Sequence, residues 1–388
     1  MEKKNWFEQN PKKTIFFIVF IGLLLSISIA EVFFRYTSNK SDEPDSLRYI
    51  RLKEWPPLIS QSNHPDDKRM QKADSLIQMK YEIKTDRDGF IQPSQRYEKA
   101  DKTIVFLGGS TTECFYVGEY NRFPYLSGVL LEQMTGLKIN SYNGGVAGNN
   151  SLHSLNILLN KVIPLKPDIV AMMHNINDLS ILLYEKSYWN NNPYRSPIVI
   201  VPNFKNENVR LVDFLKTVKN FLIPNVYQKL VVDLIKVRLF GVKIGIDVDE
   251  FERVRGQKVV SDKEKIKKEF EMNLQTFISL CKIRGITPVL MTQQNRLTPI
   301  PDPLISKTLV AFLKKNVDIE YKDYKEVYDL LSQTIRTVGL KNGVMVIDLD
   351  KEIPHTKEFM YDVVHFNDNG SKLAAEIISK KLLPVVRQ

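Results

Sequence analysis

Short apolar runs alternate with amphipathic stretches from Asp101 to the end of the chain, and this alternation restricts the fold more than any other feature. Several of the amphipathic stretches have helical spacing, and one of them, residues 270–284, ends at Gly285. Alternating strands and helices predict a parallel sheet covered on both faces. We therefore expect an α/β fold, a doubly wound (flavodoxin-like) sandwich with a parallel sheet of about five strands. The candidate strands are residues 103–107, 138–142, 168–173, 287–291 and 344–349.

Residues 180–260 interrupt this alternation. They are rich in Tyr, Trp, Asn and Pro at first, and later they contain apolar stretches such as residues 226–239. We expect an insertion that packs beside the core. Residues 101–388 would then form one α/β domain that carries this insertion.

A largely apolar run covers residues 14–34, where Glu31 is the only charged residue. A helix of this length is about long enough to cross a hydrocarbon layer of roughly 30 Å. A cleaved signal peptide would use small residues near Ser28 and Ala30 as its processing site, whereas an uncleaved signal anchor would keep the helix. The length favours the anchor, so we predict one transmembrane helix at residues 14–34.

Basic residues flank this run on both sides, so their distribution does not decide the orientation by itself. Because long domains can cross a membrane despite their charge, we expect residues 1–13 in the cytoplasm and the large domain outside it, periplasmic or extracellular. Residues 35–100 are polar and contain several prolines. We expect them to form a stalk and a peripheral cover.

The net charge of +10 is spread along the whole chain. It would suit a membrane surface or an acidic glycan, although a solvated basic surface is the simpler explanation. Without an arginine-rich arm, a zinc-type spacing or a basic repeat, nucleic acid is not an expected partner. Cys114 and Cys281 lie far apart and outside any CxxC pattern, so they form neither a disulfide framework nor a zinc site. Two buried free thiols are expected, and one disulfide stays an alternative.

The first strand of the α/β region runs directly into Gly108-Gly109-Ser110. In a doubly wound sheet, ligands bind beyond the carboxyl ends of the strands. Two glycines allow a sharp turn there, which would expose Ser110 at the edge of the sheet. Alternatively, Ser110 or Thr111 only caps a helix. A phosphate loop is not expected, because no lysine follows the glycines.

The next two strands also end in residues that could serve a reaction. The second ends in Asn143-Gly144-Gly145, whose backbone N–H groups could bind an oxyanion or simply form a turn. The third is followed by Asn177, whose amide could point into the same crevice or cap a turn. Three successive strands thus deliver Ser, Gly and Asn to one edge.

A serine nucleophile needs a base, and the chain contains five histidines. His365 differs from the others because Asp362 precedes it by three residues. On a turn or short helix this spacing places a carboxylate near the imidazole, where it could accept a hydrogen bond from Nδ1 and direct Nε2 toward the serine.

The order of these blocks, their places at strand ends and the late DxxH pair resemble the SGNH (GDSL-type) hydrolase family. The resemblance runs from about residue 101 to the C-terminus, without residues 180–260. It implies that Ser110 is the nucleophile, that His365 is its general base and that Asp362 orients His365. The implied oxyanion hole consists of the Ser110 N–H, the Gly145 N–H and the Asn177 side chain.

Two residues depart from the family's usual pattern. Gly109 stands where an aspartate is common, and Asn175 stands where a glycine is usual. Neither departure removes a catalytic group, but both leave the substrate open.

The resemblance implies hydrolysis of ester-linked acyl groups, O-acetyl groups above all, without a metal or organic cofactor. Together with the apolar helix, it suggests an acylated carbohydrate of the cell envelope as the substrate. An O-acyltransferase to a glycan would use the same triad. A catalytically silent glycan-binding or scaffold protein is a further alternative, although all three triad residues are present.

Overall fold

The computed structural model describes residues 5–37, 46–190, 192, 195–202 and 254–387. The chain divides into two compact units, residues 1–47 with 200–208, and residues 48–199 with 209–388. The apolar stretch at 226–239 of the predicted insertion lies outside the described residues.

The first unit contains the helices α1 (Trp6–Gln9) and α2 (Pro11–Thr37). Residues Pro11–Ile29 of α2 are long and apolar enough to cross a membrane or to act as a signal sequence, and their large apolar side chains are exposed. The predicted apolar helix is therefore present. Its orientation, and the expected boundaries of the domains, stay predictions.

A five-stranded parallel sheet forms the centre of the second unit, in the order β5-β4-β6-β8-β9. Numbered along the chain, this is the 2-1-3-4-5 order of flavodoxin-like sheets, so the predicted fold class is confirmed. The direction of winding reverses between β4 and β6, which are the first and third strands of the sheet in the chain. The strands are β4 (Lys102–Gly108), β5 (Ile139–Gly145), β6 (Ile169–Met173), β8 (Thr287–Met291) and β9 (Met345–Ile347).

The predicted elements differ from the observed ones mainly at their ends. The strand predicted at 344–349 stops at Ile347, because the Asp348 carboxylate binds Thr292 and Arg336 and helix α14 (Leu349–Glu352) begins directly afterwards. The helix predicted at 270–284 begins earlier, at Lys263, because it extends back to its N-cap at Asp262.

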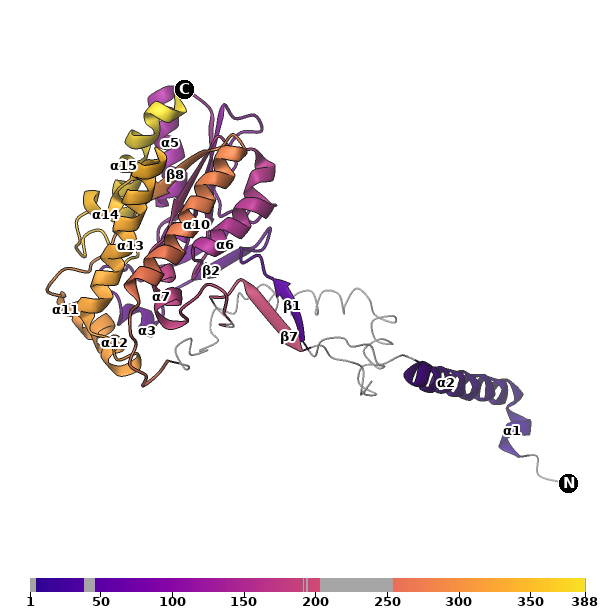
Figure 1. The fold of residues 1–388 in the computed structure, drawn as a ribbon. Coiled ribbons are helices and arrows are strands. Elements are labelled where there is room, and N and C mark those ends of the chain that lie inside the picture. The colour runs from indigo at the N-terminus through magenta and orange to yellow at the C-terminus, as the bar shows by residue number, and fades with distance from the viewer. Residues whose placement is uncertain (1–4, 38–45, 191, 193–194, 203–253, 388) are drawn as a thin grey trace. The chain divides into compact units, whose positions relative to one another are not determined.

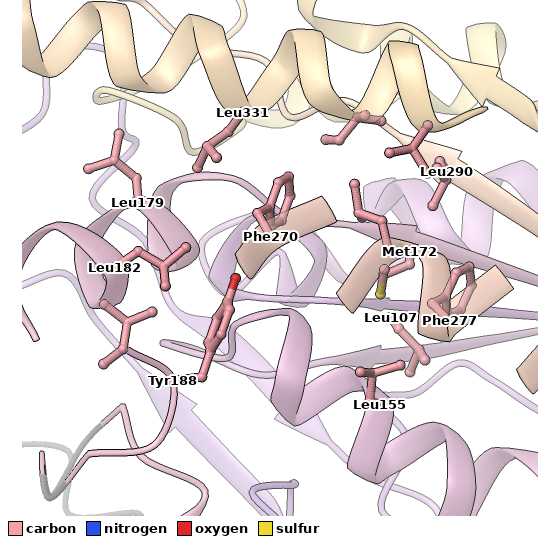
Figure 2. Packing of buried hydrophobic residues seen from close by; sticks show 14 of the residues in the cluster. Leu107, Leu155, Met172, Leu179, Leu182, Tyr188, Phe270, Phe277, Leu290 and Leu331 are labelled. Atoms are coloured by element: carbon pink, nitrogen blue, oxygen red, sulfur yellow. The ribbon is translucent and has the colours of Figure 1, made fainter. Parts of the chain in front are cut away.

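Helices cover both faces of the sheet (Figure 1). Alternate residues of β4 point to opposite faces, as expected for a strand with a period of two. Val105 and Leu107 pack with residues of α6, α10 and α13, whereas Ile104 and Phe106 pack with residues of α5 and α15. Figure 2 shows the first of these layers, in which Leu107, Met172 and Leu290 of the strands lie near Phe270 and Phe277 of α10. The helices of the two layers are α5 (Phe123–Thr135), α6 (Ser151–Ile157), α10 (Lys263–Ile283), α13 (Tyr321–Asn342) and α15 (Asp368–Val386).

Residues 52–100 pack on the sheet domain rather than standing apart from it. The antiparallel strands β2 (Ser60–Asn63) and β3 (Tyr81–Lys84) form a hairpin-like pair, and Ile91 bridges to Asn143 of β5. Trp55, Phe90 and Ile91 are buried. A stalk and a peripheral cover were expected for residues 35–100, and the division of this segment between the two stays a prediction. The remaining elements are β1 (Ser46–Ile50), α3 (Asp67–Met70), α4 (Ser110–Glu113), α7 (Ile176–Tyr184), β7 (Ile198–Pro202), α11 (Pro303–Ile305), α12 (Ala311–Asn316) and α14 (Leu349–Glu352).

Replacing Phe106 by Ala tests whether the layer beneath α5 holds the domain together. Phe106 is 1% exposed and meets Phe123 edge-on, with ring centroids 5.7 Å apart. We expect Phe106→Ala to lower the free energy of unfolding by about 3–5 kcal/mol, because it leaves a cavity in a packed core. Urea titration followed by circular dichroism measures this loss. Ile283→Ala is the control, because Ile283 is 79% exposed. This variant should unfold at nearly the same urea concentration as the wild type.

Candidate active site

The register of three neighbouring strands brings three loops together. Gly108, the last residue of β4, is paired with Gly145 of β5 on one side and with Met173 of β6 on the other. Since the strands are parallel, the segments that follow them leave from the same edge of the sheet. This edge lies at the reversal of winding, where flavodoxin-like folds bind their ligands.

Ser110, His365 and Asp362 form a hydrogen-bonded chain at this edge. Ser110 is the first residue of α4, and its Oγ lies 2.7 Å from Nε2 of His365. On the other side of the ring, Nδ1 of His365 lies 2.8 Å from both carboxylate oxygens of Asp362. The side chains of His365 and Asp362 are 23% and 17% exposed, so this chain of groups is accessible from solvent. These are the distances expected for a serine, its base and the group that orients the base.

The backbone around Asp362 holds the carboxylate and the ring in this geometry. Asp362 Oδ1 accepts hydrogen bonds from the N–H groups of Val364 and His365, at 3.1 and 2.9 Å. The ring of His365 stacks on Tyr361, with centroids 5.6 Å apart and planes 7° apart. Burial alone would raise the pKa of Asp362, but the nearby His365 and these hydrogen bonds outweigh it and lower that pKa. The carboxylate therefore stays ionised at neutral pH.

The DxxH loop is also braced by residues of the N-terminal part of the second unit. The N–H of Asp74 donates to the carbonyl of Tyr361 at 3.1 Å. The Arg296 guanidinium donates to the Asp74 carboxylate, at 2.7 and 2.9 Å, and to the carbonyl of Met360. Neither Asp74 nor Arg296 stood out in the sequence, because an acid and a base 222 residues apart give no local pattern.

Asn177 lies beside the Gly109–Ser110 turn. A Cβ atom on Gly109 would overlap the Nδ2 atom of Asn177, so a larger residue there would require the Asn177 side chain to shift. The Nδ2 atom donates to the carbonyl of Asn149 at 2.8 Å, and the Oδ1 atom accepts from Nη1 of Arg195 at 2.8 Å. The structure thus brings Asn177 to Ser110, as expected from the strand ends.

Gly145 differs from its predicted role. Its N–H donates to Oδ1 of Asn143 at 2.9 Å and is therefore occupied. The residue is needed for close packing, because a Cβ there would overlap the backbone N of Glu113. Among the described residues, no acceptor binds the N–H of Gly148 further along the same loop. This corrects the expectation that the Gly145 N–H is free to bind an oxyanion.

Glu113 is a buried acid under the site that the sequence did not single out. It is 2% exposed, and its Oε1 accepts from the Trp55 indole at 2.9 Å and from the Ala147 N–H at 3.0 Å. Burial raises its pKa to about 7, although both hydrogen bonds and the charges of His365 and Lys53 oppose this shift. Because Glu113 is the last residue of α4 and accepts from the Ala147 N–H, it joins the helix that begins at Ser110 to the loop after β5.

A second Ser-His-Asp arrangement occurs within the core. Ser154 Oγ lies 2.7 Å from Nε2 of His174, and Nδ1 of His174 lies 3.6 Å from the Asp178 carboxylate. All three residues are at most 3% exposed, so a dissolved substrate cannot reach them. Asp178 also accepts hydrogen bonds from Ser151 and Tyr188, which identifies the cluster as a structural network.

The other sequence features have structural explanations. Asn175, one of the departures from the family pattern, donates to the Tyr328 carbonyl and to Ser332 Oγ, so it ties the start of α7 to α13. Cys114 and Cys281 are buried free thiols, as expected, and burial raises the pKa of each to about 12. Within the described part of the chain, no cluster of three or more His, Cys, Asp or Glu residues could hold a metal ion.

No protein-family model and no curated protein sequence matches the chain. Solved structures with similar arrangements include a lipase/acylhydrolase from Enterococcus faecalis, at 17% identity and a TM-score of 0.40 over 73% of this chain and 96% of that one. An acetylxylan esterase from Geobacillus stearothermophilus gives 14% identity and a TM-score of 0.39 over 74% and 95%. A protein from Parabacteroides merdae described as a GDSL-like lipase has 13% sequence identity and a TM-score of 0.41. This match covers 73% of this chain and 96% of that one. All three names describe ester-hydrolysing enzymes, but these values are too low to transfer a residue's role or an activity.

Glu113→Gln tests the buried acid through the pH dependence of stability. The folded protein holds the Glu113 proton up to about pH 7, whereas the unfolded chain loses it near its ordinary pKa of 4.5. The contribution of Glu113 to stability therefore falls as the pH rises between these values, by up to about 3 kcal/mol. Urea unfolding at pH 5, 6 and 7 should show that Glu113→Gln lacks this part of the decline. Parallel pH curves for the two proteins would contradict the shift.

Proposed function

We propose that this protein is a serine hydrolase of the SGNH (GDSL) type that cleaves ester-linked acyl groups. The observation that carries the proposal is the continuous contact from Asp362 through His365 to Ser110 Oγ, with 2.8 and 2.7 Å steps. Its position at the carboxyl edge of the sheet and its partial exposure support the same conclusion.

The proposed reaction begins when Ser110 Oγ attacks the ester carbonyl carbon and His365 Nε2 takes the hydroxyl proton. Asp362 holds Nδ1 and stabilises the positive charge of the imidazolium. The tetrahedral intermediate then collapses, the acyl group stays on Ser110, and His365 returns the proton to the departing alcohol. Water, deprotonated by His365, attacks the acyl carbon. The bond between this carbon and Ser110 Oγ then breaks, the acid leaves, and His365 returns the proton to Ser110 Oγ.

The negative oxygen of the intermediate needs hydrogen-bond donors near Ser110. Ser110 is the first residue of α4, and its N–H has no acceptor among the described residues. The Nδ2 atom of Asn177 carries two protons and uses one of them in its bond to the Asn149 carbonyl, so the other can bind the oxyanion. We propose that the Gly148 N–H is the third donor, in place of Gly145. Its loop is adjacent to Asn177, because the Asn149 carbonyl accepts from the Asn177 amide.

We further propose that the substrate is an acylated, most simply acetylated, carbohydrate of the cell envelope. This rests on the sequence resemblance and on the apolar helix at Pro11–Ile29. In this proposal α2 anchors the chain as a single-pass segment, residues 1–13 are cytoplasmic and residues 101–388 form the catalytic domain outside. Protease digestion of spheroplasts, in which the cytoplasmic membrane is intact, should remove the catalytic domain. Protection of the domain there, with digestion only after lysis, would reject the location.

The first test is hydrolysis of p-nitrophenyl acetate by the full-length protein in detergent. Ser110→Ala and His365→Gln should each lower kcat by about 10⁴-fold or more, because the residues act as one unit. His64→Gln is the matched control, because His64 is exposed and remote in sequence from the triad. Circular dichroism of each variant should match the wild type.

Equal rates in the wild type and in Ser110→Ala would contradict the serine mechanism. If neither protein hydrolyses the ester, the result would contradict the simple esterase and favour a selective transferase or a binding protein. Product analysis with an acetylated donor glycan, with and without an acceptor glycan, separates hydrolysis from transfer.

Asn177→Ala tests the proposed oxyanion hole. Removing one such donor should lower kcat by about 10²–10³-fold, with little change in KM, because the bond forms in the transition state. Asn160→Ala is the matched control, since Asn160 is exposed and its side chain donates to the Asn156 carbonyl of its own helical turn. A loss confined to KM would instead assign Asn177 to substrate binding.

A further inference from the structure

We propose that Arg195, at the start of the inserted region, is a positioning residue that sets the orientation of the Asn177 amide in the oxyanion hole. This inference rests on the proposed function. It assigns part of the reaction site to the segment that interrupts the α/β alternation, which the sequence resemblance does not cover.

The two partners of the Asn177 amide leave it only one orientation. A guanidinium can only donate a hydrogen bond, so the atom that faces Arg195 Nη1 at 2.8 Å must be the oxygen. A carbonyl can only accept, so the atom that faces the Asn149 carbonyl at 2.8 Å must be the nitrogen. A flipped amide would place oxygen against oxygen and N–H against N–H. Arg195 thus keeps the donor end of Asn177 beside Gly109 and Ser110.

The contact from Arg195 is also a charge-assisted hydrogen bond. Such bonds are roughly twice as strong as neutral ones. Positive charge at Oδ1 draws electron density from the amide and makes the remaining Nδ2 proton a better donor to a developing oxyanion. Loss of Arg195 should therefore slow the chemical step, even if the Asn177 side chain stays in place.

The backbone of Arg195 is held on both sides. Its N–H donates to Oδ1 of Asn192 at 3.1 Å, and its carbonyl accepts from Nδ2 of Asn150 at 3.1 Å. Asn150 also caps α6 and follows the Asn149 carbonyl that binds Asn177. Asn192, which accepts from the Arg195 N–H, and Ser196, which follows Arg195, are 5% and 1% exposed, so both are buried in the domain. A side chain with such a fixed base is suited to a positioning role.

Removal of the Arg195 guanidinium should lower kcat, and the size of this loss should depend on the presence of Asn177. In the full-length protein, Arg195→Met keeps an unbranched stem and removes every guanidinium donor. We expect it to lower kcat for p-nitrophenyl acetate by about 10- to 100-fold, the range for a hydrogen bond to a charged group, with KM almost unchanged. Arg195→Lys should recover most of this loss, because it keeps the charge. Arg284→Ala, at the exposed end of α10, should match the wild type.

A double-mutant cycle distinguishes positioning from direct action. If Arg195 acts through Asn177, then adding Arg195→Met to Asn177→Ala should cause almost no further loss in kcat. Losses that multiply in the double variant, or a loss confined to KM, would overturn the inference and indicate direct contact with the substrate. Wild-type kcat in a folded Arg195→Met would also overturn it.

These outcomes are distinct from failure of the proposed function. If the wild type and Ser110→Ala hydrolyse the ester at the same rate, the function is rejected and the role of Arg195 is rejected with it. If hydrolysis depends on Ser110 but not on Arg195, only the inference fails. Circular dichroism and the urea midpoint of each Arg195 variant identify a loss that comes from misfolding.

Discussion

The parallel pairing of β4 with β5 on one side and β6 on the other is the constraint on which the site depends. Because Gly108 is in register with both Gly145 and Met173, the segments that follow the three strands begin at the same level of the sheet. Ser110, the loop after β5 and Asn177 therefore meet without any of them being close in the sequence. A shift of one residue in either pairing would turn the alternating side chains of a strand toward the opposite face, so the two packed layers hold the register.

Asp362 and His365, which form a hydrogen-bonded chain with Ser110, come from the far end of the chain, and the N-terminal part of the second unit helps to hold them. Asp74 binds both the Tyr361 carbonyl and the Arg296 guanidinium, next to the DxxH loop. Trp55 binds Glu113, which in turn binds the loop after β5. The segment expected to be a peripheral cover therefore contributes to the support of the site. Substitutions in that segment should therefore alter the positions of Ser110, Asp362 and His365, although the segment contains none of these three residues.

Buried polar groups explain why the site differs from its prediction in detail. The geometry of Ser110, Asp362, His365 and Asn177 agrees with the arrangement expected from strand ends and the DxxH spacing. The free N–H expected at Gly145 is taken by the side chain of Asn143. Whether a backbone N–H is free depends on the rotamer of a neighbouring side chain, which no spacing in the sequence reveals. Ser154, His174 and Asp178 likewise resemble a triad in composition, and they are excluded by their burial and by the hydrogen bonds that Asp178 accepts from Ser151 and Tyr188.

Local pattern was enough to identify the fold class, the strands that end in Ser, Gly and Asn, the DxxH pair and the apolar N-terminal helix. These features depend on the spacing of apolar residues and on short motifs, which are properties of adjacent residues. The tertiary structure alone decided the strand order, the partners Arg195, Arg296 and Glu113, and the hydrogen bond that occupies the Gly145 N–H. Each of these depends on contacts between residues far apart in the chain, and such contacts are set by the packing of the whole domain rather than by neighbouring residues.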